Sequence, residues 1–247
     1  MTGDRPPRGH GGLVVELAGI PGSGKSRLAR TLGGGLADRG VTVSLPQTAF
    51  APTVPRGRRL AGKVVAGACA AATDPATTQR IVRALLSSGQ SAPTDLAARL
   101  LQWLVAQHVT TVAGRHPGVG LVDEGVLQCL WSIGLRGDVE PVLQALAASP
   151  RAAGPDVLVV VRVAPEVALD RLTNRASRHS RTQRLGEEDG LEELRRGERL
   201  LDRLVAWFGV EAPAPVPVVT VSSAGDKSER HEPVVDQLCD LAADRAS

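Results

Sequence analysis

The stretch that decides the fold of this chain is Leu13-Val14-Val15-Glu16-Leu17-Ala18, followed by Gly19-Ile20-Pro21-Gly22-Ser23-Gly24-Lys25-Ser26. Its first part is a short apolar run that is typical of a buried strand, and residues 25–38 have the pattern of a helix. The loop between them fits G-x-x-x-x-G-K-[ST] at every position. A strand, this loop and a helix in direct succession indicate a phosphate-binding loop rather than a chance glycine-rich turn.

Each residue type in this loop has a physical reason to hold a phosphate chain. Glycines allow a tight turn that brings backbone N–H groups around an anion, and the following helix directs its positive dipole end at the same place. We expect the Lys25 ammonium to reach the β- and γ-phosphates of ATP and the Ser26 hydroxyl to bind Mg²⁺. The predicted nucleotide-binding residues are Gly19, Ile20, Pro21, Gly22, Ser23, Gly24, Lys25, Ser26 and Arg27.

Apolar strands alternate with helices along the rest of the chain. Further strands are expected at 41–45, 119–122, 157–163 and 216–221, and further helices at 60–72, 75–86, 93–113, 126–135, 139–148, 165–175, 187–208 and 234–243. Continuous apolar strands separated by helices are typical of a parallel sheet covered on both faces. We therefore predict a three-layer α/β P-loop NTPase fold with a five-stranded parallel sheet in one domain, residues 13–247, after a disordered leader at 1–12.

Two segments do not fit this alternation in a simple way. Residues 46–60 are rich in Pro and Arg, and we expect a loop on the ligand side of the sheet. Gly33, Gly34 and Gly35 lie inside the helix expected at 25–38. Each glycine costs about 1 kcal/mol relative to alanine in a helix, so the sequence leaves open whether this helix ends early or kinks.

A pair of carboxylates follows the strand expected at 119–122. Asp123 comes directly after this apolar run, and ligands of parallel sheets bind at the carboxyl ends of the strands. Asp123 is therefore a candidate Mg²⁺ ligand together with Ser26, or the group that accepts a proton from an attacking hydroxyl. Glu124 is an alternative, since a glutamate here can activate water in an ATPase, and helix capping by Asp123 is a structural alternative.

An arginine-rich segment follows the fourth expected strand. Arg171, Arg175 and Arg178 are spaced by four and three residues, so they share one face of a helix, and Arg181 and Arg184 follow. Mobile arginines can stabilise a transferring phosphoryl group and exclude water. We expect a lid at about 174–186 with Arg175, Arg178 and Arg181 as catalytic residues. The alternative is a solvated basic face.

These motifs resemble the thymidylate kinase-like branch of the P-loop nucleotide and nucleoside kinases. The resemblance is carried by the loop 19–26, by Asp123-Glu124-Gly125, by 161–172 with the arginines after it, and by 218–225, which is similar to the family's last strand and base-side loop. It implies ATP and Mg²⁺ at the loop and a flexible lid with Arg175 and Arg178. It also implies an acceptor near Asp123.

The acceptor side of the chain departs from the family pattern. Glu124 stands where thymidylate kinases have an arginine after the third strand. The family's arginine for the acceptor phosphate corresponds to a position near Val105, and the nearest arginines here are Arg99 and Arg115. Further acceptor-side candidates, with solvated or core roles as alternatives, are Arg56, Arg58, Arg59, Lys63, Trp103 and Trp131.

Composition restricts the class of function. The net charge is +3 with a pI of about 9.1, and no clustered basic excess or nucleic-acid-binding signature is evident, so nucleic acid is not expected as a partner. No apolar run reaches the roughly 20 residues of a membrane span, so we expect no such span and a cytoplasmic protein. A homodimer is left open. The histidines and cysteines lack metal-ligand spacing.

The leading hypothesis is an ATP-dependent kinase, a phosphotransferase that acts on a small nucleotide-like molecule or another metabolite. The alternative from a different class is a regulatory or partner-dependent ATPase that uses Glu124 to activate water. A kinase of nucleic-acid 5′ ends is disfavoured by the modest charge, and no Asn-Lys-x-Asp motif indicates a GTPase.

Overall fold

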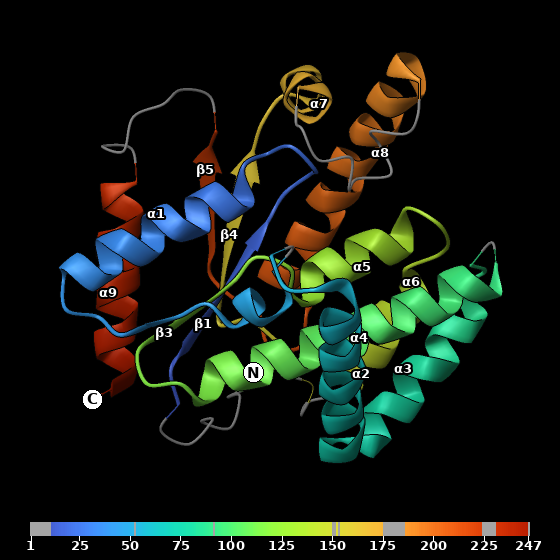
Figure 1. Ribbon diagram of the computed structural model, residues 1–247, viewed down its shortest axis with the longest axis horizontal. Helices are drawn as coiled ribbons and strands as arrows, with labels where there is room; N and C mark the ends of the chain where they lie inside the picture. Colours follow the sequence, from blue (N-terminus) through green and yellow to red (C-terminus); the bar gives the residue numbers. More distant parts are fainter. Residues whose placement is uncertain are drawn as a thin grey trace.

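A parallel sheet of five strands, in the order β2-β3-β1-β4-β5, forms the middle layer of the molecule (Figure 1). The computed structural model describes residues 11–51, 53–90, 92–149, 152, 154–174, 186–223 and 231–246. The strands are β1 (Leu13–Ala18), β2 (Val43–Ser44), β3 (Val119–Val122), β4 (Val157–Arg162) and β5 (Val218–Ser222). The central strand β1 pairs with β3 on one side and with β4 on the other.

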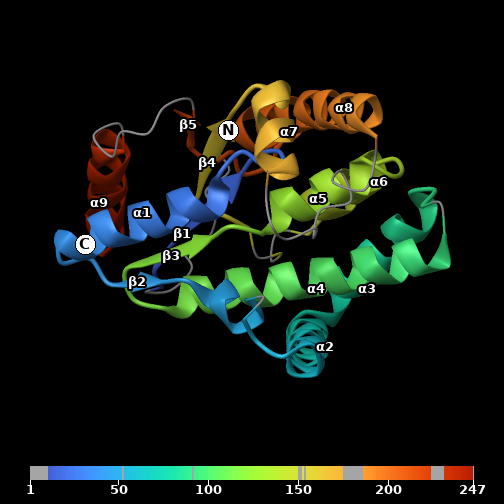
Figure 2. The same ribbon diagram turned by 45° about the horizontal axis from the view of Figure 1, so that its top comes forward.

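The two faces of the sheet are covered by different helices, as Figure 2 shows. Side chains alternate between the faces of a strand. Leu13, Val15 and Leu17 of β1 therefore pack with the apolar residues of α1 (Lys25–Asp38) and α9 (Glu232–Ala246). Val14 and Ala18 face the other layer, which includes α4 (Pro93–Arg115), α5 (Val126–Gly134) and α8 (Glu187–Ala206). The predicted three-layer α/β fold is confirmed.

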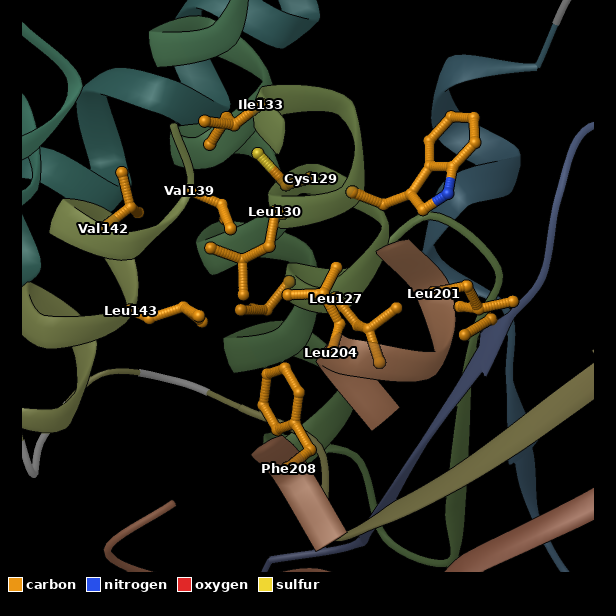
Figure 3. Close-up of a cluster of buried hydrophobic side chains, with 14 of the residues drawn as sticks. Leu127, Cys129, Leu130, Ile133, Val139, Val142, Leu143, Leu201, Leu204 and Phe208 are labelled. Atoms are coloured by element: carbon orange, nitrogen blue, oxygen red, sulfur yellow. The ribbon is translucent and has the colours of Figure 1, made fainter. Parts of the chain in front are cut away.

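The second layer has its own apolar interior between α5, α6 (Glu140–Ala147) and α8 (Figure 3). Leu127 and Leu130 of α5 converge there with Leu143 of α6, Leu204 of α8 and Phe208. The remaining elements are η1 (Pro46–Phe50), α2 (Arg56–Thr73), α3 (Pro75–Ser87), α7 (Pro165–Thr173) and η3 (Trp207–Glu211). Among the described residues, no helix is both long and apolar enough to cross a membrane.

The segment 46–60 is more ordered than the sequence indicated. It forms the short helix η1 and then the first turns of α2, which begins at Arg56. Pro55 is the N-cap residue of α2, and the arginines that follow are good helix formers, so the predicted loop was wrong over this part. The strand expected at 41–45 was too long, because only Val43 and Ser44 pair with β3.

The start of the ordered domain also differs from the expected leader at 1–12. Residues 1–10 lie outside the described part of the chain, whereas Gly12 is buried. A Cβ atom at Gly12 would lie 2.0 Å from the backbone oxygen of His116, and the N–H of Leu13 donates to the oxygen of Gly118 at 2.8 Å. Gly12 therefore packs with the domain.

Helix α1 continues without a break through Gly33, Gly34 and Gly35. Its packing explains one of the three glycines. A Cβ atom at Gly35 would lie 3.0 Å from Cγ2 of Val235 on α9, whereas a Cβ atom at Gly34 would meet nothing within 4 Å. The glycine at position 35 thus permits the close approach of α1 and α9, and Gly34 has no such contact to preserve.

We predict that Gly34→Ala raises the free energy of unfolding by about 0.5–1 kcal/mol, because alanine loses less backbone entropy in a helix. Gly35→Ala is the matched control and should gain less or lose stability, because its methyl group meets Val235. Urea unfolding of both variants measures the difference. An equal gain at both positions would show that α1 and α9 tolerate the extra methyl group.

Candidate functional site

The loop 19–24 runs from the end of β1 into the first turn of α1, and its backbone depends on glycine. Gly22 and Gly24 have φ angles of 83° and 95°, which other residues rarely adopt. A Cβ atom at Gly22 would also lie 2.5 Å from the backbone oxygen of Ala168 on α7. No side chain caps the N-terminus of α1, so this helix end is suited to an anion.

Lys25 lies folded over its own loop. Its Nζ donates to the backbone oxygens of Gly19 at 2.6 Å and of Ile20 at 3.3 Å. Burial lowers the pKa of Lys25 to about 8, and the carboxylates of Glu124 and Asp123 act against this shift. The ammonium group therefore lies within the field of the acidic pair at the end of β3.

The two residues predicted to bind Mg²⁺ are in direct contact. Ser26 Oγ on α1 donates to Oδ2 of Asp123, directly after β3, at 2.9 Å. The alternative that Asp123 caps α5 is not observed, because the N-cap residue of α5 is Gly125 and the described side chain that accepts a hydrogen bond from the first turn of α5 is that of Glu16. A hydroxyl and a carboxylate oxygen are the hard ligands that Mg²⁺ prefers, and Mg²⁺ commonly uses few protein ligands beside phosphate oxygens and water. The residues fit such an ion.

A cavity of about 650 Å³ opens beside the acidic pair. Pro21 of the loop and Glu124 line it together with residues of α2, α4, α5 and α8, among them Lys63, Arg99 and Gln102, and with Arg136 after α5. Withdrawal from water raises the pKa of Glu124, and the negative charge of Asp123 acts in the same direction. Lys25 and Lys63 oppose this shift, and part of the Glu124 side chain stays exposed. The volume lies within the usual range for small-molecule sites.

Of the arginines predicted for the nucleotide site and the lid, the structure describes Arg27 and Arg171. Arg171 donates from Nη1 to Ser223 Oγ at 2.6 Å and from Nη2 to the Ser223 backbone oxygen at 3.0 Å, so it joins α7 to the end of β5. Arg27 lies exposed on α1. The predicted lid arginines Arg175, Arg178 and Arg181 lie outside the described residues, as does Arg184.

The acceptor-side candidates also have different positions. Trp103 is buried in the core, with 1% of its surface exposed. Trp131 is also largely buried and donates from Nε1 to the backbone oxygen of Gly197 at 2.7 Å, although it contributes to the cavity wall. Arg99 and Lys63 line the cavity, whereas Arg115 lies exposed in the last turn of α4.

Glu16 is a buried carboxylate that the sequence reasoning missed. It lies in the middle of β1, is 1% exposed, and its Oε1 accepts a hydrogen bond from the N–H of Gln128 at 3.1 Å. A Cβ atom at Gly125 would lie 2.4 Å from the Glu16 carboxyl carbon. Burial raises the pKa of Glu16 to about 7, and backbone N–H groups at the start of α5 oppose this shift. A single charged residue inside an apolar strand was the available signal.

Glu16 thereby connects the central strand with the segment that carries the acidic pair. Its carboxylate lies at the N-terminus of α5, where no side chain of the helix itself provides a cap. The helix dipole favours negative charge at this end. The segment from Asp123 to Gly125 is thus fixed at both ends, by β3 before it and by the hydrogen bond of Glu16 to the first turn of α5 after it.

Comparisons with known proteins yielded no match to a family model and none to a curated protein sequence. Among solved structures, the chain is similar to deoxyadenosine kinase from M. mycoides with bound dCTP, at a TM-score of 0.49 and 13% identity, covering 92% of this chain and 100% of that one. The same enzyme with bound dATP gives 0.48 and 13%, covering 92% and 99%. A likeness at this level does not indicate what the present chain binds.

The pKa of Lys25 leads to a prediction about proton uptake. Since this pKa is about 8 in the free protein and a bound triphosphate would raise it again, ATP binding at pH 8 should take up a fraction of a proton. Calorimetry in buffers of different ionisation enthalpy measures the uptake. Lys25→Arg is the control, because arginine stays charged. Equal uptake in both proteins would rule out Lys25 as its source.

The raised pKa of Glu16 predicts a pH-dependent stability. The folded state binds the Glu16 proton more tightly than the unfolded state, whose pKa is near 4.5. The free energy of unfolding should therefore fall by about 3 kcal/mol as the pH rises from about 4.5 to 7. Urea unfolding of the wild type and of Glu16→Gln over this range isolates the effect. Parallel curves for the two proteins would contradict the prediction.

Proposed function

We propose that this protein is an ATP- and Mg²⁺-dependent kinase that phosphorylates a small molecule bound in the cavity beside Glu124. The observation that carries the proposal is the meeting of two sites at the acidic pair. Asp123 contacts Ser26 of the phosphate loop at 2.9 Å, and the adjacent Glu124 lines a cavity that Pro21 of the same loop also lines. A nucleotide on the loop would face an acceptor in the cavity.

The residues of the site have distinct roles in this proposal. Lys25 and the loop N–H groups hold the phosphates. Ser26 and Asp123 hold Mg²⁺, which when bound neutralises charge on the β- and γ-phosphates. Glu124 orients the acceptor hydroxyl and accepts its proton, and its raised pKa suits a general base. We assign Arg175, Arg178 and Arg181 to stabilisation of the transferring group, as the sequence indicates.

A hydroxyl acceptor fits the observed acidic pair better than thymidine monophosphate does. The thymidylate kinase-like branch uses an arginine where this chain has Glu124, and Val105, not an arginine, lines the cavity at the corresponding region of α4. The nucleotide side therefore follows the P-loop kinases, and the acceptor remains a nucleotide-like molecule or another metabolite. The cytoplasmic location and the homodimer remain predictions.

The test compares Glu124→Gln and Asp123→Asn with the wild type. A coupled assay measures ATP consumption alone and with a panel of nucleosides, nucleotides and sugars. We expect slow hydrolysis alone, faster turnover with an acceptor, and a loss of about 10²–10⁴-fold in Glu124→Gln with ATP affinity retained. Asp123→Asn should raise the Mg²⁺ concentration that half-maximal turnover requires.

The same assay distinguishes the ATPase alternative. Fast hydrolysis without any acceptor that disappears in Glu124→Gln would assign Glu124 to the activation of water and would overturn the kinase proposal. Glu193→Gln is the matched control, because Glu193 also lines the cavity but comes from α8 rather than from the strand end beside the loop.

A further inference from the structure

Different sets of charges act on the charged side chains of the cavity beside Glu124. The charged groups that act on Glu124 are Asp123, Lys25 and Lys63. A separate set of charged groups, Arg136 and Asp95, acts on Arg99. The Cys129 thiol is also nearby, but burial raises its pKa to about 12 and keeps it neutral. Glu124, Arg99 and Arg136 nevertheless line the same cavity. The charges that act on Glu124, beside the phosphate loop, therefore differ from those that act on Arg99, and Arg99 lines the cavity together with a second guanidinium group, that of Arg136.

Arg99 makes no ion pair within the described part of the chain. Its Nη1 donates to the neutral amide oxygen of Gln102 at 2.8 Å, its Nε is buried without an acceptor, and no ion pair between described residues includes it. Burial lowers the pKa of Arg99, and the nearby charge of Arg136 acts in the same direction. A half-buried cation without an anion is unfavourable.

Arg136 is only partly neutralised. Its Nη1 lies 3.4 Å from both carboxylate oxygens of Asp95, which is long for a charge-assisted hydrogen bond. Asp95 thus acts on both guanidinium groups that line the cavity. An additional anion would balance this charge, and guanidinium groups match the planar or tetrahedral oxygens of carboxylates and phosphates.

The apolar part of the cavity wall suits an organic molecule. Leu101 and Val105 of α4 and Leu135 after α5 line the cavity together with Leu60 of α2. These side chains offer apolar contacts, and Gln102 and Ser132 add polar groups near Arg99. The space is therefore shaped for a molecule larger than an inorganic ion.

On the basis of the kinase function proposed above, we propose that the acceptor is an organic anion. Its carboxylate or phosphate group binds Arg99 and Arg136, and its hydroxyl group faces Glu124. In the reaction the hydroxyl oxygen forms a bond to the γ-phosphorus of ATP, and the bond from this phosphorus to the β,γ-bridging oxygen breaks. ADP leaves with that electron pair, and the hydroxyl proton passes to Glu124. The anionic group of the acceptor is thus its anchor and not its reacting group.

The experiment uses glucose, glucuronate and glucose 1-phosphate, which share a ring and differ in charge. Calorimetry measures their binding to the full chain with the loop saturated by ADP and Mg²⁺. We expect both anions to bind at least about tenfold more tightly than glucose, and the tighter of the two identifies a carboxylate or a phosphate as the preferred anchor. Arg99→Gln should reduce the preference below about threefold.

Three further variants control for folding and for net charge. Arg115→Gln removes an exposed arginine of the same helix and should keep the preference. Arg99→Lys keeps a cation and should retain part of it. Asp95→Asn removes the competing carboxylate beside Arg136 and should strengthen anion binding, an effect opposite in sign to that of Arg99→Gln.

Several results would overturn the proposal. These are equal or tighter binding of glucose, no binding of any of the three compounds, a preference that survives in Arg99→Gln, or weaker anion binding in Asp95→Asn. If Arg99→Gln does not fold, Arg99→Lys and Asp95→Asn decide. ATP consumption is measured separately, so an anion preference without turnover would count against the kinase function and not against the anion site.

Discussion

The parallel pairing of β1 with β3 is the constraint on which the site depends. With Glu16 in register with Val122, the two strands end side by side, so the phosphate loop and the acidic pair leave the sheet at the same edge. The contact of Ser26 with Asp123 then follows from the topology, although the two residues are far apart in the sequence. The helices of the second layer add the cavity next to this edge.

The central strand β1 packs against two layers of helices, and its contacts with these layers differ in polarity. Its odd-numbered residues contact α1 and α9, where only apolar packing is required. Its even-numbered residues face α4 and α5, and Glu16 introduces a carboxylate into this otherwise apolar side. The unfavourable burial of that group is offset in part by the backbone N–H groups at the start of α5. The acidic pair is thus positioned by a polar contact made within the core.

The elements that depend on short-range patterns in the sequence were predicted from it. The loop 19–26, the five strands and the acidic strand end follow from short apolar runs and glycine spacing, and the fold agrees. The helical start of α2 was missed because Pro and Arg richness resembles a loop, whereas tertiary contacts with α4 favour a helix. Three features depend on segments that are distant in the sequence, and no spacing in the sequence reveals them. They are the burial of Glu16, the hydrogen bonds of Arg171 to Ser223, and the proximity of Arg99 to Arg136.

The contact between Glu16 and Gly125 makes two distant positions depend on each other during evolution. While a carboxylate occupies position 16, a side chain at position 125 has no room, because its first carbon would overlap the carboxyl group. If an apolar residue replaced Glu16, the N–H of Gln128 at the start of α5 would lose its acceptor, and a larger residue at position 125 would become permissible. A substitution at position 125 should therefore be accepted only where the carboxylate at position 16 has already been replaced.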